Sequence, residues 1–208
     1  MIKRVIFDVD NTLIAWKDEY ILPLRKVLDQ LQVPFTEEQF QCADNCVVEY
    51  EKYHDIYINE DFVDFVSKRT GLSLPIEFAD LLIKEQGVCF EEDLKLVEMI
   101  KYLSEKYELM VLSNWYTETQ KARLKGLGIL EYFSIVSGGD ERPLKPNLKA
   151  FETVLKGCNP SECLMIGDNL HHDIIPALEL GLQVYWLTKE KSDKYPTISS
   201  IYDLKNIL

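Results

Sequence analysis

The sequence lacks the residue spacings that hold zinc. Its five cysteines include no close pair of the zinc-binding type, and although Cys42 and Cys46 share a helix face, no histidine or second pair completes a tetrahedral site. His171 and His172 are adjacent, so they point in different directions from a helix and do not chelate one ion together. We therefore expect all five cysteines to be reduced and mostly buried thiols.

The sequence also lacks a membrane anchor and an excess of positive charge. No apolar run approaches the length of a membrane span, and the apolar N-terminal stretch is too short and too acidic for a signal peptide. Lys and Arg number 23 against 35 Asp and Glu, which gives a formal net charge of -12. Because such a surface repels nucleic acids and anionic membranes, we expect neither as a partner. Binding of an anionic substrate then requires a local positive group. From the lack of a signal peptide and of a membrane span we expect a cytoplasmic location.

Beyond these absences, the chain has the composition of a globular core. Its 208 residues are 47% hydrophobic, which suits one domain or a core domain with an inserted module. After a helix at about 91–106, strands and helices alternate with short connections, which predicts an α/β fold with a parallel sheet covered on both faces. The expected strands are 109–113, 133–137, 164–167 and 183–187; the expected helices are 117–127, 147–156 and 170–180; residues 189–196 form a loop and 199–208 a short element of uncertain type.

A long helical region interrupts this alternation near the N-terminus. Thr36 and Gln39 fit a capping box that opens a helix reaching about Tyr53. Asn59 is expected to cap a second helix, which stops at Gly71, and a third helix is expected at 76–85. We predict that residues 16–88 form an inserted helical cap, and that residues 1–15 and 89–208 form the core domain.

Two acids end the first strand, which is otherwise apolar. Aspartate is disfavoured in strands, and a buried carboxylate without a partner costs several kcal/mol. Side chains two apart in a strand project to the same side, so Asp8 and Asp10 are expected to converge on one point. This is the geometry of a metal site, or of a nucleophile with its acid/base partner.

Other polar residues follow the later strands. Ser113 and Asn114 follow one strand, Asp168 follows another, and Lys145 precedes a proline. Carboxyl ends of parallel strands share one edge of the sheet, where ligands bind in such folds. Three carboxylates without a histidine favour Mg²⁺, which takes carboxylates together with phosphate oxygens, while serine and lysine supply donors to an anion. The sequence thus predicts a site for a phosphoryl group bridged to magnesium, in which an aspartate attacks phosphorus.

Four motifs in order resemble those of the haloacid dehalogenase superfamily of phosphohydrolases. They are DVDNT at 8–12, Ser113-Asn114 after a hydrophobic strand, Lys145-Pro146 ahead of a helix, and GDNLHHD at 167–173. The match covers residues 3–15 and about 91–187. The resemblance implies a Rossmann-like core with a helical cap between the first two motifs.

The resemblance implies a role for each acidic residue. Asp8 is the nucleophile and a magnesium ligand. Asp10 is the general acid for the leaving alcohol and then the base that activates water, and its backbone carbonyl is expected to reach the metal. Asp168 completes the metal ligands, with Asp173 and Asn169 behind them, and Asp173 is expected either to orient the ligands or to pair with the motif lysine.

The resemblance also implies a phosphate-binding set. Ser113 and Lys145 hold the phosphoryl oxygens, with help from the backbone N–H groups of Val9 and Asn114. Plainer interpretations exist for single residues, since Ser113 also suits the N-cap of the following helix and Lys145 alone suits a solvated loop. Among the aromatic residues, Trp16 and Trp115 are the candidates for a substrate pocket, because each closely follows a motif.

Asp10 separates the branches of this superfamily. A halide leaving group needs no proton, whereas an alkoxide does, and dehalogenating members lack an acid at this position. The sequence therefore predicts a Mg²⁺-dependent phosphomonoesterase for a small soluble metabolite, either a nucleotide or a sugar phosphate. The alternatives are a 2-haloacid dehalogenase, a phosphomutase, and a non-catalytic module that binds a metabolite or partner. The oligomeric state is left open.

Overall fold

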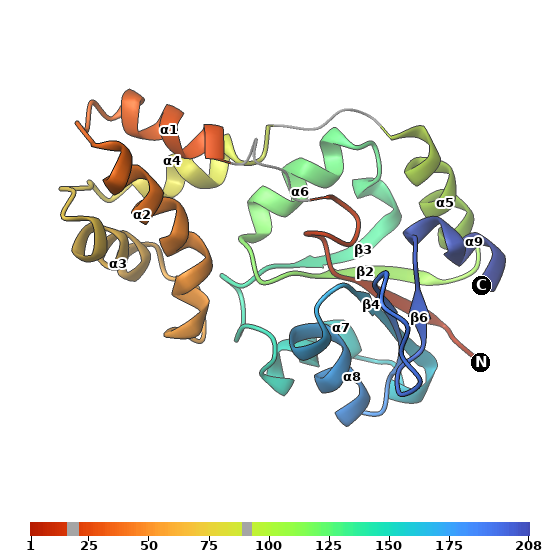
Figure 1. Cartoon of the computed structure of the whole chain (residues 1–208). Coiled ribbons are helices and arrows are strands. Elements are labelled where there is room, and N and C mark those ends of the chain that lie inside the picture. The colour runs from red at the N-terminus through yellow and green to blue at the C-terminus, as the bar shows by residue number, and fades with distance from the viewer. Residues whose placement is uncertain (16–20, 89–92) are drawn as a thin grey trace.

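The computed structural model describes residues 1–15, 21–88 and 93–208. Its sheet has the strand order β3-β2-β1-β4-β5-β6, and all pairings are parallel (Figure 1). The predicted α/β fold with a parallel sheet is therefore confirmed. The strands are β1 (Arg4–Phe7), β2 (Glu108–Leu112), β3 (Phe133–Ser137), β4 (Cys163–Gly167), β5 (Gln183–Leu187) and the short β6 (Thr197–Ile198), which the sequence did not reveal.

Helices cover both faces of the sheet, as the alternation predicts (Figure 1). One face carries α5 (Leu94–Ser104), α6 (Thr117–Gly126) and the C-terminal α9 (Leu204–Ile207). The other face carries α7 (Glu152–Leu155) and α8 (Ile175–Glu179). Short 3-10 turns complete the core at η3 (Leu130–Tyr132), η4 (Leu148–Phe151), η5 (Pro160–Glu162) and η7 (Ile201–Asp203).

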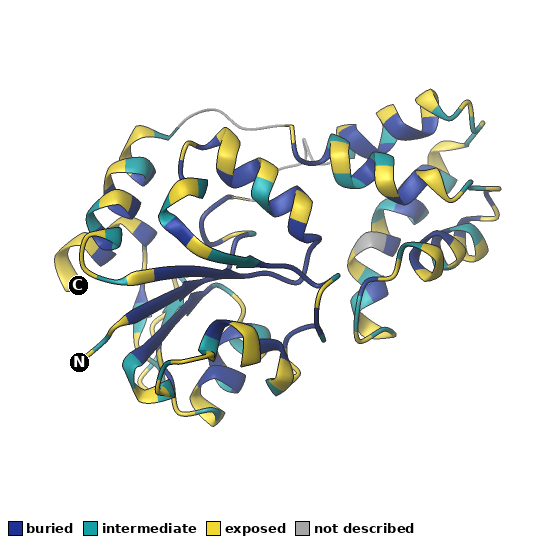
Figure 2. Ribbon diagram, turned by 180° about the vertical axis from the view of Figure 1, so that it is seen from behind, coloured by how far each residue is buried: buried dark blue, intermediate teal, exposed yellow. Residues whose placement is uncertain are grey.

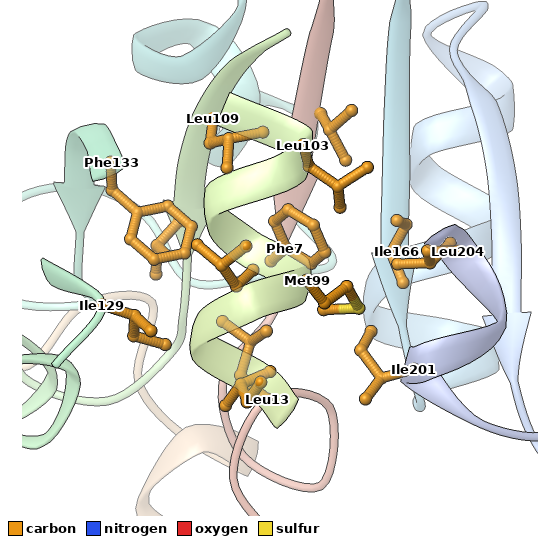
Figure 3. Close-up of a cluster of buried hydrophobic side chains, with 14 of the residues drawn as sticks. Phe7, Leu13, Met99, Leu103, Leu109, Ile129, Phe133, Ile166, Ile201 and Leu204 are labelled. Atoms are coloured by element: carbon orange, nitrogen blue, oxygen red, sulfur yellow. The ribbon is translucent and has the colours of Figure 1, made fainter. Parts of the chain in front are cut away.

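Alternation along β1 divides the core into two layers. Phe7 packs on the α5 side with Met99 and Ile166 (Figure 3). Ile6 packs on the α7 side. All four residues of β1 are buried, so the strand is covered on both faces (Figure 2). Each fully buried side chain of this size contributes about 1.5–3 kcal/mol, so the layers fix β1 firmly at the centre of the sheet.

Helices α1 (Ile21–Gln30), α2 (Glu37–Glu49), α3 (Asn59–Thr70) and α4 (Glu77–Glu85), with the 3-10 turn η2 (Tyr50–Lys52), lie to one side of the sheet (Figure 1). They share their own apolar core, which includes Tyr50, Phe62 and Phe78. Trp115 and Tyr116 of the sheet domain also pack into it. We propose these four helices as the cap; the expected boundaries at 15/16 and 88/89 adjoin residues outside the described ranges.

Local sequence signals set the start of α2 and the end of α3. The capping box between Thr36 and Gln39 is formed at the start of α2, and Gly71 ends α3 in the left-handed conformation. The prediction for Asn59 is wrong, because this residue lies inside α3 and its amide donates to Asp80 of α4 at 2.8 Å. The tertiary contact with α4 thus replaces the local cap. Among the described residues, no helix is both long and apolar enough to cross a bilayer.

Two helices of the sheet domain differ from their predicted form. The segment expected as a helix at 147–156 is a 3-10 turn, η4, followed by α7. The segment at 170–180 starts as a π-helical turn, η6 (Leu170–Ile174), and becomes regular only in α8. Pro176 lies in the first turn of α8 and has no N–H to donate backward, so the α-helical hydrogen-bond pattern begins anew there.

Candidate active site

The site lies at the carboxyl ends of the central strands. The chain fills one half of the sheet with β1, β2 and β3 and then crosses to β4 on the other side of β1, which opens a crevice between β1 and β4. A cavity of about 350 Å³ is found there. Residues from all four sequence motifs line it: Asp8, Asp10, Ser113, Lys145, Asp168 and Asp173.

A tight turn after β1 presents Asp8 to the cavity. The N–H groups of residues 12, 13 and 14 all donate to the Val9 carbonyl, and Asn11 turns the chain with a φ of +60°, a conformation that Asn tolerates better than most residues. The Thr12 hydroxyl donates to Asp8 Oδ2 at 3.3 Å. The turn thus holds the carboxylate through both its backbone and its neighbour's side chain.

Lys145 links Asp8 to Asp173 inside the protein. Its Nζ donates to Asp8 Oδ1 at 2.8 Å and to Asp173 Oδ1 at 2.5 Å, and all three side chains are at least nine-tenths buried. Burial alone lowers the pKa of Lys145, but the charges of Asp173 and Asp8 outweigh burial and raise this pKa well above its usual value. The expected pairing of Asp173 with Lys145 is therefore present, and the ammonium stays charged.

Three carboxylates meet at this end of the sheet. Oxygens of Asp8, Asp168 and Asp173 lie within 4.8 Å of one another. Burial, then the charges of Asp8 and Asp173, raise the pKa of Asp168 to about 7, and Trp186 of β5 holds the Asp168 carbonyl through an indole hydrogen bond of 2.7 Å. The oxygens are close enough to share one cation, and the raised pKa reflects first the burial of Asp168 and then its repulsion by the two neighbouring carboxylates.

Gly167 at the end of β4 makes room for this cluster. A Cβ atom at this position would lie 2.3 Å from Asp173 Oδ2, so a larger residue would displace the carboxylate. Asn169 then accepts hydrogen bonds from the backbone N–H groups of His171 and His172, and its own N–H donates to Asp173 at 3.0 Å. Asn169 therefore fixes the turn that carries Asp173.

Asp10 lines the same cavity, and two side chains of α6 hold its carboxyl group. Arg123 Nη1 donates to Asp10 Oδ1 at 2.7 Å, and Gln120 Nε2 donates to Oδ2 at 2.7 Å. Strand β1 ends at Phe7, before either acid. The turn after the strand, and not the alternation of side chains along a strand, therefore brings Asp8 and Asp10 to the same cavity. Burial raises the pKa of Asp10, while the charge of Arg123 opposes the rise.

Ser113 and Asn114 are organised by neighbours on both sides. Ser113 Oγ accepts from the Trp115 N–H at 3.2 Å and from Gln120 Nε2 at 2.8 Å. The N-cap alternative for Ser113 is wrong, because α6 begins only at Thr117, whose N–H donates to Asp140. Asn114 Oδ1 accepts from the Lys145 backbone N–H at 2.7 Å, so its side chain fixes the lysine-bearing loop.

The sequence analysis missed four residues around the site. Gln120 and Arg123 are spaced three apart and fully buried, but on the sequence they look like ordinary polar residues of an exposed helix. Glu51 comes from η2 and lines the cavity. Arg142 is buried and binds the carbonyls of Ser113 and Ser137, and burial lowers its pKa to about 10. The one available signal was the spacing of Gln120 and Arg123 on one helix face.

The remaining predicted pocket residues have different outcomes. Trp115 lines the cavity and also packs against Tyr57 of the cap at a ring distance of 5.1 Å. Trp16 lies outside the described residues. His172 lines the cavity, while His171 is exposed, so these two side chains do point in different directions. The roles expected for the N–H groups of Val9 and Asn114 stay predictions.

Replacing Lys145 with methionine is expected to destabilise the metal-free protein by about 3–5 kcal/mol, because Asp8 and Asp173 lose the cation they share. Urea denaturation in the presence of a chelator measures the free energy of unfolding. The matched control is Lys149→Met, which removes an exposed ammonium and is expected to change stability by less than about 0.5 kcal/mol. Equal stability of Lys145→Met and wild type would show that the ion pair contributes nothing net.

The chain is similar to known proteins over most of its length. A family model for haloacid dehalogenase-like hydrolases matches residues 2–181. The chain is 26% identical to human N-acylneuraminate-9-phosphatase, over 100% of this chain and 94% of that protein, and 28% identical to glyceraldehyde 3-phosphate phosphatase of Methanothermobacter thermautotrophicus, over 93% and 88%. The magnesium-bound structure of the HAD-hydrolase YfnB from Bacillus subtilis has a TM-score of 0.73 at 19% identity, covering 100% of this chain and 98% of that one. The chain belongs to the haloacid dehalogenase-like hydrolases.

Proposed function

We propose that this protein hydrolyses phosphate monoesters of small metabolites through an aspartyl-phosphate on Asp8. The observation that carries the proposal is that the four motifs line a single cavity, with the Asp8 carboxylate, the Lys145 ammonium and the Asp10 carboxyl facing it. The family membership and the phosphatases among the relatives support the same reaction.

In the first step an oxygen of Asp8 attacks phosphorus, and the bond between phosphorus and the ester oxygen breaks. Asp10 in its protonated form gives its proton to the departing oxygen, so that a neutral alcohol leaves. Lys145 and the Ser113 hydroxyl are placed to donate hydrogen bonds to the phosphoryl oxygens. Arg123 and Gln120 hold Asp10 in position for this transfer.

In the second step Asp10, now ionised, takes a proton from a water molecule, and the oxygen of that water attacks phosphorus. The bond between phosphorus and Asp8 breaks, which releases inorganic phosphate and restores both carboxyl groups. One residue thus serves first as acid and then as base. Burial raises the pKa of Asp10, which favours its protonated form before the first step.

The residues at the site fit a magnesium ion. Five carboxyl groups line the cavity, on Asp8, Asp10, Glu51, Asp168 and Asp173, while Lys145 is already shared between two of them. A phosphate dianion would be repelled by such a surface unless a divalent cation were also bound. Oxygens of Asp8 and Asp168 would hold it, with Asp173 behind them, and the ion would supply charge neutralisation to the phosphoryl group. The magnesium bound to YfnB supports this choice of metal.

The position of Asp10 favours a phosphatase over a 2-haloacid dehalogenase. Two buried side chains of α6 hold its carboxyl group at the cavity, an arrangement that serves proton transfer. Displacement of a halide has no use for such a group. A cavity of about 350 Å³ also suits a small ligand. We therefore infer a small phosphorylated metabolite, such as a sugar phosphate or a nucleotide, as the substrate.

Mg²⁺-dependent release of inorganic phosphate from a panel of small phosphate esters tests the proposed function. We expect turnover with added Mg²⁺, loss of turnover with a chelator, and recovery when Mg²⁺ is restored. Halide release from a 2-haloacid without metal would instead support a dehalogenase. Binding without turnover of any ester would support a non-catalytic module.

Asp8→Asn is expected to lower kcat by at least about 1,000-fold, because an amide of the same shape is a poor nucleophile. Phosphate release gives the rate, and circular dichroism with thermal melting checks that the fold is retained. Asp64→Asn, which neutralises an exposed carboxylate on α3, is the matched control and is expected to keep full activity. Substantial turnover by Asp8→Asn would refute the covalent mechanism.

Asp10→Asn is expected to slow turnover by about 100- to 10,000-fold for alkyl esters, because their leaving oxygen needs a proton. The loss in the bond-breaking step should be smaller for aryl esters with good leaving groups. A series of aryl and alkyl phosphates of graded leaving-group pKa measures this dependence in single turnovers. Equal losses across the series would argue against general acid catalysis by Asp10.

A further inference from the structure

The cavity has a wall that the phosphoryl chemistry does not use. Val48 of α2 and Glu51 of η2 line it from the cap, next to Trp115 of the sheet domain. When a phosphoryl group lies beside Asp8 and Lys145, the rest of the substrate contacts this wall. The wall therefore meets the leaving alcohol, and its chemistry bears on which alcohols fit.

The carboxylate of Glu51 is fixed at both oxygens. Asn114 Nδ2 donates to Oε2 at 2.9 Å, and the Tyr57 hydroxyl donates to Oε1 at 3.3 Å. Hydrogen bonds donated to both oxygens favour the ionised form of a carboxyl group. Burial raises the pKa of Glu51, and the hydrogen bond from Asn114 and the charge of Lys145 reduce this rise without cancelling it.

The orientation of Asn114 is itself determined by the phosphate side of the site. Its Oδ1 accepts from the Lys145 backbone N–H at 2.7 Å, and its Nδ2 also donates to the Lys145 carbonyl at 2.9 Å. The amide is therefore unable to flip without losing these bonds, and its remaining N–H points at Glu51. Glu51 is thereby held at a fixed position relative to Lys145.

Within the described part of the chain Glu51 forms no direct ion pair, and the charges of Lys145 and Arg142 act on it only at longer range. The salt bridges found among residues 1–15, 21–88 and 93–208 do not include Glu51. Of the described residues that line the cavity, the cation formers are Lys145, already paired with two aspartates, and His172. A carboxylate or second phosphate on the leaving group would thus face Glu51 without a partner, whereas hydroxyl or ammonium groups would find an acceptor.

We propose that Glu51 is a specificity-determining residue that selects phosphate esters whose leaving alcohol carries hydroxyl or amino groups and rejects those that carry a second anionic group. This inference rests on the proposed phosphatase function and names the substrate class for it. Like charges brought together in a partly desolvated pocket repel each other strongly, so the discrimination is expected to be large enough to measure.

The test compares two esters that differ in one group: glycerol 3-phosphate, which ends in a hydroxymethyl group, and 3-phosphoglycerate, which ends in a carboxylate. Their kcat/KM values, and their inhibition constants against p-nitrophenyl phosphate hydrolysis, are measured for wild type and Glu51→Gln. Wild type is expected to prefer glycerol 3-phosphate by at least about tenfold, and Glu51→Gln to reduce that ratio at least about fivefold, because the amide keeps the shape but not the charge.

The matched control is Glu77→Gln, which removes an exposed acid of the cap that does not line the cavity, and its ratio is expected to equal that of wild type. Hydrolysis of p-nitrophenyl phosphate with a ratio unaltered by Glu51→Gln would overturn the specificity role alone. A wild-type preference for 3-phosphoglycerate, or failure of glycerol 3-phosphate to compete, would also overturn it. Absence of hydrolysis of every ester would overturn the proposed function and this inference together.

Discussion

The structure depends on one buried ammonium group that holds two carboxylates. Lys145 lies between Asp8, which follows β1, and Asp173, which follows β4, and it thereby joins the two sides of the crevice. Without that charge, three carboxylates whose oxygens lie within 4.8 Å of one another would repel one another in a buried setting. The other features of the site, including the turn after β1 and the absence of a side chain at Gly167, serve to keep these groups in contact.

The cap is joined to this arrangement through backbone and side-chain contacts. The Tyr57 N–H donates to the Gly139 carbonyl and the Leu144 N–H to the Asp55 carbonyl, so the two lobes meet through ordered hydrogen bonds. The Asn114 amide lies between Glu51 of the cap and the Lys145 backbone. Asn114, which positions the loop that carries Lys145, therefore also positions a carboxylate of the cap, and this links the proposed choice of substrate to the proposed chemistry.

The sequence predicted the fold well because its signals are local or periodic. Apolar runs and the glycines that end helices are visible in the chain itself, and the parallel sheet follows from their alternation. Errors arose where a distant partner replaced a local one. Asn59 bonds to Asp80 of another helix instead of capping its own, and Ser113 accepts from Gln120 while Asp140 receives the N–H at the start of α6.

The sequence by itself determined which chemical groups are available: four motifs that supply carboxylates, one lysine and one hydroxyl, in an order that places them at strand ends. Only the tertiary structure decided which groups touch. In the sequence Arg123 and Gln120 resemble surface residues of a helix, but in the structure they are buried and bind Asp10. Glu51 is one of many acidic residues in the cap, and its position in η2 places it at the cavity. The reason is physical, since periodicity along a chain records which residues are buried, whereas charge pairing depends on distances between segments far apart in sequence.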